Sequence, residues 1–158
     1  MTVVADASPL IALARIDRLD LLRGSFGALL VPEAVWHEVA VAGLHKAGAG
    51  DIWRADWIER RSVQDAGLVA LLRQDLGAGE TEAIVLARET NADVLLMDER
   101  LGRAAARRLG LRVTGLVGIL VDARERGHLT DPEAVVADLH ERAGFWFTEE
   151  LRRLVVGQ

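Results

Sequence analysis

The stretch VVADASPLI, residues 3–11, places a charged residue where a buried strand gives way to a helix. The apolar run TVVA, residues 2–5, is typical of a buried strand, and Asp6 follows it directly. Ser8 then predicts a helix N-cap, with Pro9 at the first helical position. A carboxylate at this junction is either an Asx-type cap or a group that serves chemistry at the end of the strand.

The composition indicates a globular domain with an aliphatic core. The 158 residues are 51% hydrophobic and only 4% aromatic, which excludes disorder and fits one domain. No apolar run approaches the ~20 residues of a membrane span, and we expect no signal peptide because Asp6 interrupts the first apolar stretch. The absence of cysteine excludes a disulfide framework and a thiolate zinc site, and it permits the cytoplasmic location that we expect.

The charge balance argues against a broad basic surface for nucleic acid. The net charge is −5, and Lys46 is the single lysine among 19 basic residues. Contacts to phosphate groups would therefore come mostly from arginine, whose guanidinium can bind a phosphate through two parallel hydrogen bonds.

Short apolar segments alternate with longer helical ones along the chain. Strands are expected at residues 2–5, 28–31, 92–97 and 111–115, while residues 57–63 fit either a strand or the end of a helix. Helices are expected at residues 8–16, 17–27, 32–42, 66–77, 79–91, 99–110, 115–127, 130–144 and 148–157. Residues 43–51 have the composition of a loop and are predicted to be the most mobile segment. This alternation predicts an α/β fold whose parallel sheet is covered on both faces.

Acidic residues stand at strand ends or in the helices that follow them, and parallel strands bring such positions to one edge of the sheet. They are Asp6, Glu38, Glu80 with Glu82, and Asp98 with Glu99. Each alone can be a cap, a favourable charge near a helix N-terminus or a solvent-facing side chain. Together they would repel one another, and a hard cation such as Mg²⁺ or Mn²⁺ would neutralise them. Such an ion can activate water for attack on a phosphodiester.

Two pairs of neighbouring acids leave the choice of ligand open. Glu80 and Glu82 would point about 200° apart on a regular helix, so only one of them faces the edge of the sheet. Glu80 is favoured because it lies nearer the start of its helix. Asp98 and Glu99 pose the same choice after the strand at residues 92–97.

Three blocks of the sequence resemble a known family. VVADASPLIALARI (3–16), VPEAVWHEV (31–39) and LGAGETEAIVLARETNADVLLMDERLGRAAARRLGLRVTGLVGILVDAR (76–124) are similar, in order and spacing, to a PIN domain. More narrowly, the chain resembles the PIN-like group described as nucleic-acid-binding or as VapC-type toxins. The resemblance implies a three-layer α/β/α fold with a central parallel sheet. It also implies metal-dependent ribonuclease activity and a homodimer held by a small antitoxin.

The resemblance assigns roles to individual residues of this chain. Four acids look like the family's metal ligands and catalytic residues, namely Asp6, Glu38, Glu80 and Asp98. The residues that would support them are Ser8, Glu82, Glu99 and Arg100. Of these, the Ser8 hydroxyl would support the first acid, and Arg100 would hold an RNA phosphate.

These observations predict a Mg²⁺- or Mn²⁺-dependent endoribonuclease, the toxin of a type II toxin–antitoxin pair. We expect one PIN-like domain over residues 1–158, with residues 128–158 as a C-terminal helical extension. The alternative is a non-catalytic PIN-like module that binds RNA or a protein partner. A phosphoacceptor receiver domain also gathers acids at strand ends, but it needs a lysine on a late strand, and no lysine follows Lys46.

Overall fold

Five short strands form one sheet whose neighbours are all parallel, in the order β3-β2-β1-β4-β5. The computed structural model describes residues 1–43 and 45–158. In chain order the strands are β1 (Val3–Ala5), β2 (Leu29–Pro32), β3 (Ile58–Arg61), β4 (Val94–Leu96) and β5 (Val113–Thr114). The α/β class and the central parallel sheet are thus confirmed.

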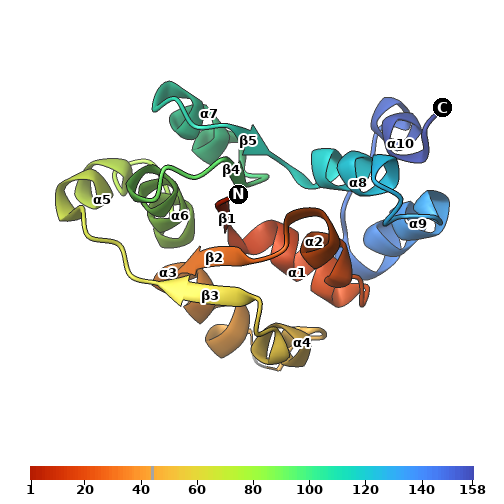
Figure 1. The fold of residues 1–158 in the computed structure, drawn as a ribbon, viewed down its shortest axis with the longest axis horizontal. Coiled ribbons are helices and arrows are strands. Elements are labelled where there is room, and N and C mark those ends of the chain that lie inside the picture. Colours follow the sequence, from red (N-terminus) through yellow and green to blue (C-terminus); the bar gives the residue numbers. More distant parts are fainter. Residues whose placement is uncertain (44) are drawn as a thin grey trace.

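Helices lie on both faces of this sheet. They are α1 (Ala7–Arg15), α2 (Asp20–Phe26), α3 (Glu33–Trp36), η1 (His37–Ala42), α4 (Ala49–Arg54), α5 (Ala66–Leu72), α6 (Ala78–Glu89), α7 (Arg100–Arg108), α8 (Leu116–Glu125), α9 (Pro132–Ala143) and α10 (Glu149–Val156). Figure 1 shows α5 and α6 to one side of the strands, and α1, α2 and α8 to α10 to the other. The arrangement fits the three layers that the resemblance implies.

The central strand β1 is buried along its whole length. Val3, Val4 and Ala5 are at most 1% exposed, because β2 and β4 flank this strand and helices cover its two faces. Parallel strands covered on both faces are continuously apolar, which explains why this stretch does not alternate apolar and polar residues. Asp6, the residue after this strand, therefore lies in a region with little access to water.

The order of the strands changes direction between β1 and β4. The chain proceeds from β1 outward to β2 and β3, then crosses back to place β4 on the other side of β1. Ala5 pairs with Leu96, and the Asp6 amide donates a hydrogen bond to the Leu96 carbonyl at 2.9 Å. This switch point is where parallel α/β sheets hold their ligands, and the two strands end there with Asp6 and Asp98.

Two local predictions differ from the structure. Ser8 is not the N-cap of the first helix, because α1 begins at Ala7 and the extended residue Asp6 (φ −82°, ψ 172°) occupies the cap position. The expected helix 32–42 is not a uniform α-helix, since it changes to a π-helix at His37.

For two further segments the sequence did not fix the secondary structure or its bounds. Residues 57–63, whose sequence fits either a strand or the end of a helix, contain the strand β3. The predicted loop 43–51 ends inside α4, and its residue 44 lies outside the described residues.

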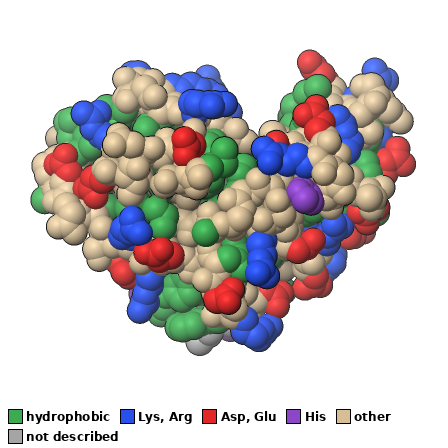
Figure 2. Space-filling model, viewed as in Figure 1, with side chains coloured by type: hydrophobic (Ala, Val, Ile, Leu, Met, Phe, Trp, Pro, Cys, Tyr) green, Lys and Arg blue, Asp and Glu red, His purple; other side chains and the backbone are tan. Residues whose placement is uncertain are grey.

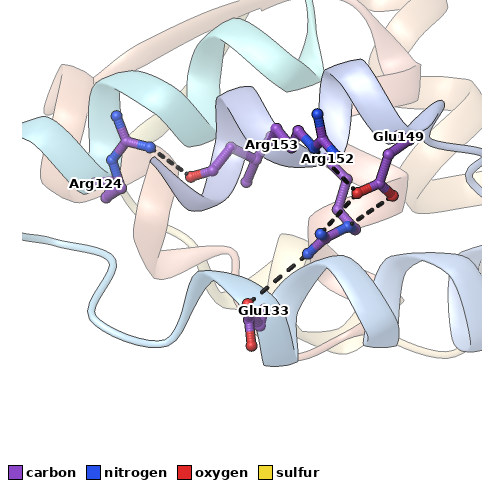
Figure 3. A network of polar contacts seen from close by, with 6 residues as sticks. Arg124, Glu133, Glu149, Arg152 and Arg153 are labelled. Carbon is purple, nitrogen blue, oxygen red and sulfur yellow. Dashed lines mark hydrogen bonds and ion pairs between the residues drawn. The ribbon is translucent and has the colours of Figure 1, made fainter. Parts of the chain in front are cut away.

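The C-terminal helices are tied to the rest of the fold by a polar network (Figure 3). The Arg124 guanidinium of α8 donates hydrogen bonds to the carbonyls of Leu154 and Val155 in α10, at 2.8 and 2.9 Å. Within α10, Glu149 accepts two hydrogen bonds from Arg152. Helix α9 packs on α1, so both ends of the chain join one body.

The surface seen in Figure 2 carries acidic and basic side chains interspersed, with an indentation at its upper edge between the regions of α7 and α10. On this face the described residues form no broad basic patch. Within the described residues, every helix is too short or too polar to cross a membrane.

Candidate functional site

Asp6 is a buried carboxylate at the switch point of the sheet. The residue is 3% exposed, and although its backbone occupies the N-cap position of α1, its side chain accepts no capping hydrogen bond from the described residues. A cap role therefore does not explain why this side chain is a carboxylate. Burial raises the pKa of Asp6 to about 7, the Ala7 amide opposes that rise, and the carboxylates of Glu80, Glu38 and Asp98 add to it. Three other acids therefore act on Asp6 electrostatically, as the sequence predicted.

Asp98 follows the neighbouring strand β4, and only one of its two carboxylate oxygens accepts a hydrogen bond from a described residue. Its Oδ1 accepts a hydrogen bond from the Leu116 amide at 2.8 Å, whereas its buried Oδ2 has no hydrogen-bond partner among the described residues. Burial raises the pKa of Asp98, and the Leu116 amide and Arg103 lower it. An orphaned buried carboxylate oxygen is costly and calls for an ion, a water or a ligand that pairs with it.

Glu99 has a different role from its neighbour Asp98. Its carboxylate accepts hydrogen bonds from the amides of Leu101 and Gly102, at 3.1 and 2.5 Å, and so caps the N-terminus of α7. With Glu99 occupied in this way, Asp98 is the better candidate for a ligand at the edge of the sheet.

Glu80 and Glu82 are separated in the same manner. Glu82 Oε1 accepts a hydrogen bond from the Ala34 amide at 3.1 Å and thereby joins α6 to the start of α3. Glu80 raises the pKa of both Asp6 and Glu38, so its carboxylate acts on both of these groups. These contacts favour Glu80 over Glu82 as the acid that faces the site.

Glu38 enters the site from an irregular helix. It is the second residue of the π-helix η1, where the Gly43 amide donates to the Glu38 carbonyl at 3.1 Å, five residues back. The side chain is exposed, but partial burial and Glu80 raise its pKa, while Lys46 lowers it. Short π-helical segments occur often at functional sites because they shift a side chain relative to a regular helix.

The remaining predicted residues lie at the margin of this cluster. Ser8 is exposed in the first turn of α1, and in the described part of the chain its hydroxyl makes no hydrogen bond to Asp6. Arg100 is exposed at the start of α7. Arg103, one turn later, donates a hydrogen bond to the Met97 carbonyl at 2.9 Å and is held close to the end of β4.

Two glycines that the sequence did not single out shape the site. A Cβ at Gly115 would lie 2.6 Å from Asp98 Oδ1 and 2.7 Å from a guanidinium nitrogen of Arg103, so any larger residue there would displace these side chains. A Cβ at Gly79 would lie 3.5 Å from Asp6 Oδ1, which places the first turn of α6 directly against the buried carboxylate. A glycine between a predicted strand and a predicted helix was the available signal for Gly115.

The donor set suits a hard divalent cation, because it consists of carboxylate oxygens and includes the orphaned Asp98 Oδ2. Across residues 1–43 and 45–158, however, no three His, Asp or Glu side chains lie close enough together to hold one ion. Like charges that repel one another keep such groups apart until a cation neutralises them. The oxygen donors therefore suit Mg²⁺ or Mn²⁺ in their chemistry, although the described residues do not gather three of them around one point.

Comparison with protein families agrees with this geometry. A family model described as DUF3368, a PIN domain, matches residues 2–158. The chain therefore belongs to the PIN domain family, and the resemblance noted in its sequence is confirmed. No curated protein matches the chain. PIN domains are generally nucleases and typically use divalent metals, so the fold defines a nuclease-like protein.

Proposed function

We propose that this protein is a metal-dependent endoribonuclease that hydrolyses phosphodiester bonds of RNA. The observation that carries the proposal is Asp6 at the switch point of the sheet: its burial, chiefly, and three further carboxylates, to a lesser degree, raise its pKa to about 7. A fold keeps such a destabilising group when the group is used, and perturbed acids in a ligand-binding edge are characteristic of active sites.

Four acids would hold the metal, Mg²⁺ or Mn²⁺. They are Asp6, Glu38, Glu80 and Asp98, from four separate segments of the chain. When bound, the ion would lower the pKa of water and balance the charge that develops on the phosphate. The protein's own part is to hold the carboxylates in place, and the buried strands β1 and β4 fix the backbone ahead of two of them, Asp6 and Asp98.

The neighbouring residues would support this arrangement in distinct ways. Glu82 and Glu99 fix the starts of α3 and α7 around the site through their hydrogen bonds. Arg100, exposed beside Asp98 and Glu99, would contact a phosphate of the substrate. The Ser8 hydroxyl, on the first turn of α1, would hydrogen-bond to the ion's water shell or to the substrate.

The biological setting is part of the proposal and draws support from the resemblance to VapC-type toxins. We infer a cytoplasmic toxin of a type II toxin–antitoxin pair, acting as a homodimer and held inactive by a small antitoxin protein. Residues 1–158 would act as one PIN-like domain, with residues 128–158 as its helical extension. Co-expression with the protein encoded next to this gene would test the antitoxin, and size measurements of the purified protein would test the dimer.

A non-catalytic module that binds RNA or a protein is the second candidate, because the four acids are not assembled into a ready ion site. Calorimetric titration with Mn²⁺ separates the two. If the protein is a nuclease, it should bind Mn²⁺ and cut single-stranded or hairpin RNAs. The Asp6→Asn variant should then lose both the binding and the cleavage. A folded protein that neither binds Mn²⁺ nor cuts any RNA of the set would support the module instead.

A further inference from the structure

A cleft opens beside the acidic site, between α1, η1 and α4. It has a volume of about 340 Å³, and one of the four acids, Glu38, lines it. Its apolar walls are formed by Ile11, Val39 and Ile52. A volume near the lower end of the roughly 300–1,000 Å³ range of small-ligand pockets admits a ligand the size of one nucleotide.

Two cations line the same cleft. Arg15, at the end of α1, is half-buried, and Lys46, the chain's single lysine, is exposed. Neither side chain forms an ion pair with another residue that the structure describes, whereas the arginines of α8 to α10 and of the turn after α8 do. Lys46 lowers the pKa of Glu38, which places its ammonium group within electrostatic reach of the acidic site.

The backbone around Lys46 is held against α1. The Lys46 amide donates to the Gly43 carbonyl at 2.9 Å, and the Lys46 carbonyl accepts from the Ala49 amide at 3.3 Å. Gly48 has φ +87°, and a Cβ there would lie 2.5 Å from the carbonyl oxygen of Ala14. This close packing holds the segment that follows Lys46 against the end of α1, and Lys46 and Arg15 line the same cleft.

These two cations can offset the repulsion between the acidic site and a negatively charged RNA strand. An acidic protein with net charge −5 and four carboxylates at its site repels a polyanion, so the strand must be held by positive charge close by. The cleft is lined both by these two cations and by the apolar side chains of Ile11, Val39 and Ile52. A nucleotide divides in the same way, into an anionic phosphate and a flat base with apolar faces.

We propose that this cleft binds one nucleotide of a single-stranded RNA next to the bond that is cut, with Arg15 and Lys46 on its phosphate and the base between Ile11, Val39 and Ile52. The inference deepens the proposed function and rests on it for the identity of the ligand. It assigns a substrate-positioning role to residues outside the acidic cluster.

The test measures RNA binding without cleavage. Asp6→Asn protein is titrated into a short fluorescein-labelled oligouridylate, and the dissociation constant is followed by anisotropy between about 50 and 200 mM salt. Arg15→Gln and Lys46→Gln are each expected to weaken binding about fivefold near 0.1 M salt, because one phosphate contact on a single strand contributes about 0.7 to the salt slope. The slope itself should fall by the same amount.

Matched variants separate the slot from the charges. Ala42→Leu fills the cleft without changing charge, so it should weaken binding several-fold and leave the salt slope unchanged. Arg23→Gln, on the exposed surface of α2, and Ala134→Leu, on the exposed surface of α9, should leave affinity unchanged. Melting curves establish that each variant is folded, and Arg15→Lys should restore most of the salt slope.

The outcomes distinguish this inference from the proposed function. If the protein cuts RNA but Arg15→Gln, Lys46→Gln and Ala42→Leu bind like their controls, the cleft assignment is overturned and the nuclease stands. If no cutting occurs but the three variants weaken binding as expected, the cleft is upheld in a protein that only binds RNA. If the Asp6→Asn protein binds no RNA even at low salt, the cleft assignment also fails.

Discussion

Replacing Asp6 by asparagine should stabilise the metal-free protein at neutral and alkaline pH. The pKa of Asp6 rises from its ordinary value of 3.8 to about 7, chiefly because the carboxylate is 3% exposed. At pH 8 the folded protein must hold this group ionised, at a cost of about 4 kcal/mol relative to a neutral side chain. Asparagine keeps the shape and a hydrogen-bond acceptor near Ala7 but carries no charge.

The pH dependence fixes the sign of this effect. The folded state binds the Asp6 proton more tightly than the unfolded state, so wild-type stability falls as pH rises from about 4 to about 7 and then levels off. The advantage of Asp6→Asn should thus be below about 1 kcal/mol at pH 4 and reach about 4 kcal/mol at pH 8. For a domain of this size that corresponds to a gain in melting temperature of about 10 °C.

The assay is thermal unfolding in EDTA across this pH range, with Asp56→Asn as the control because Asp56 is exposed. Saturating Mn²⁺ should then stabilise the wild type more than the variant. The difference in melting temperature between the two proteins should therefore shrink or change sign. A variant that melts at or below the wild type at pH 8 in EDTA would refute the reasoning, as would a gap that stays constant with pH.

Three further expectations concern the same edge of the sheet. Glu82→Ala should lower the free energy of unfolding in urea by about 1 kcal/mol, because its hydrogen bond to α3 is lost, and should leave Mn²⁺ affinity unchanged. Glu80→Ala should lower Mn²⁺ affinity. Equal losses of affinity in the two variants would contradict the choice of Glu80 over Glu82 as a ligand. Calorimetry should show Mn²⁺ affinity rising about tenfold per pH unit below about pH 7 and levelling off above it, where Asp6 is mostly ionised; a flat profile would count against Asp6 as a ligand. Gly115→Ala should lower both the melting temperature and Mn²⁺ affinity, since the new Cβ meets the Asp98 carboxylate at 2.6 Å; unchanged affinity would separate Asp98 from the metal.

The fold class could be predicted from the sequence because it follows from the periodicity of apolar residues and from the order of the strand-like and helical segments. Alternating apolar and helical segments predict parallel strands, and parallel strands bring Asp6 and Asp98 to one edge. The structure adds that β1 and β4 are neighbours, a fact that depends on the crossover after β3 and has no local signal.

Contacts between distant segments were beyond the reach of the sequence. The hydrogen bond from the Ala34 amide to Glu82 joins residues 48 apart, so helix geometry alone left Glu80 and Glu82 as alternatives. The π-helical turn at Glu38 likewise depends on packing, because its hydrogen bonds leave no distinct period in so short a segment. Ser8 missed the cap position because the strand ends one residue before Asp6, which itself is the extended residue ahead of α1.

The most direct test of the central claim is the chemistry of the cut ends. Wild-type protein is incubated with a 5′-labelled single-stranded RNA in Mn²⁺ or in EDTA, beside Asp6→Asn, and the termini of the products are identified. Attack by metal-activated water predicts 5′-phosphate and 3′-hydroxyl ends that form only with Mn²⁺ and only with Asp6 intact. Products ending in 2′,3′-cyclic phosphate, or cutting that persists in EDTA or in the variant, would contradict a metal-dependent site built on Asp6.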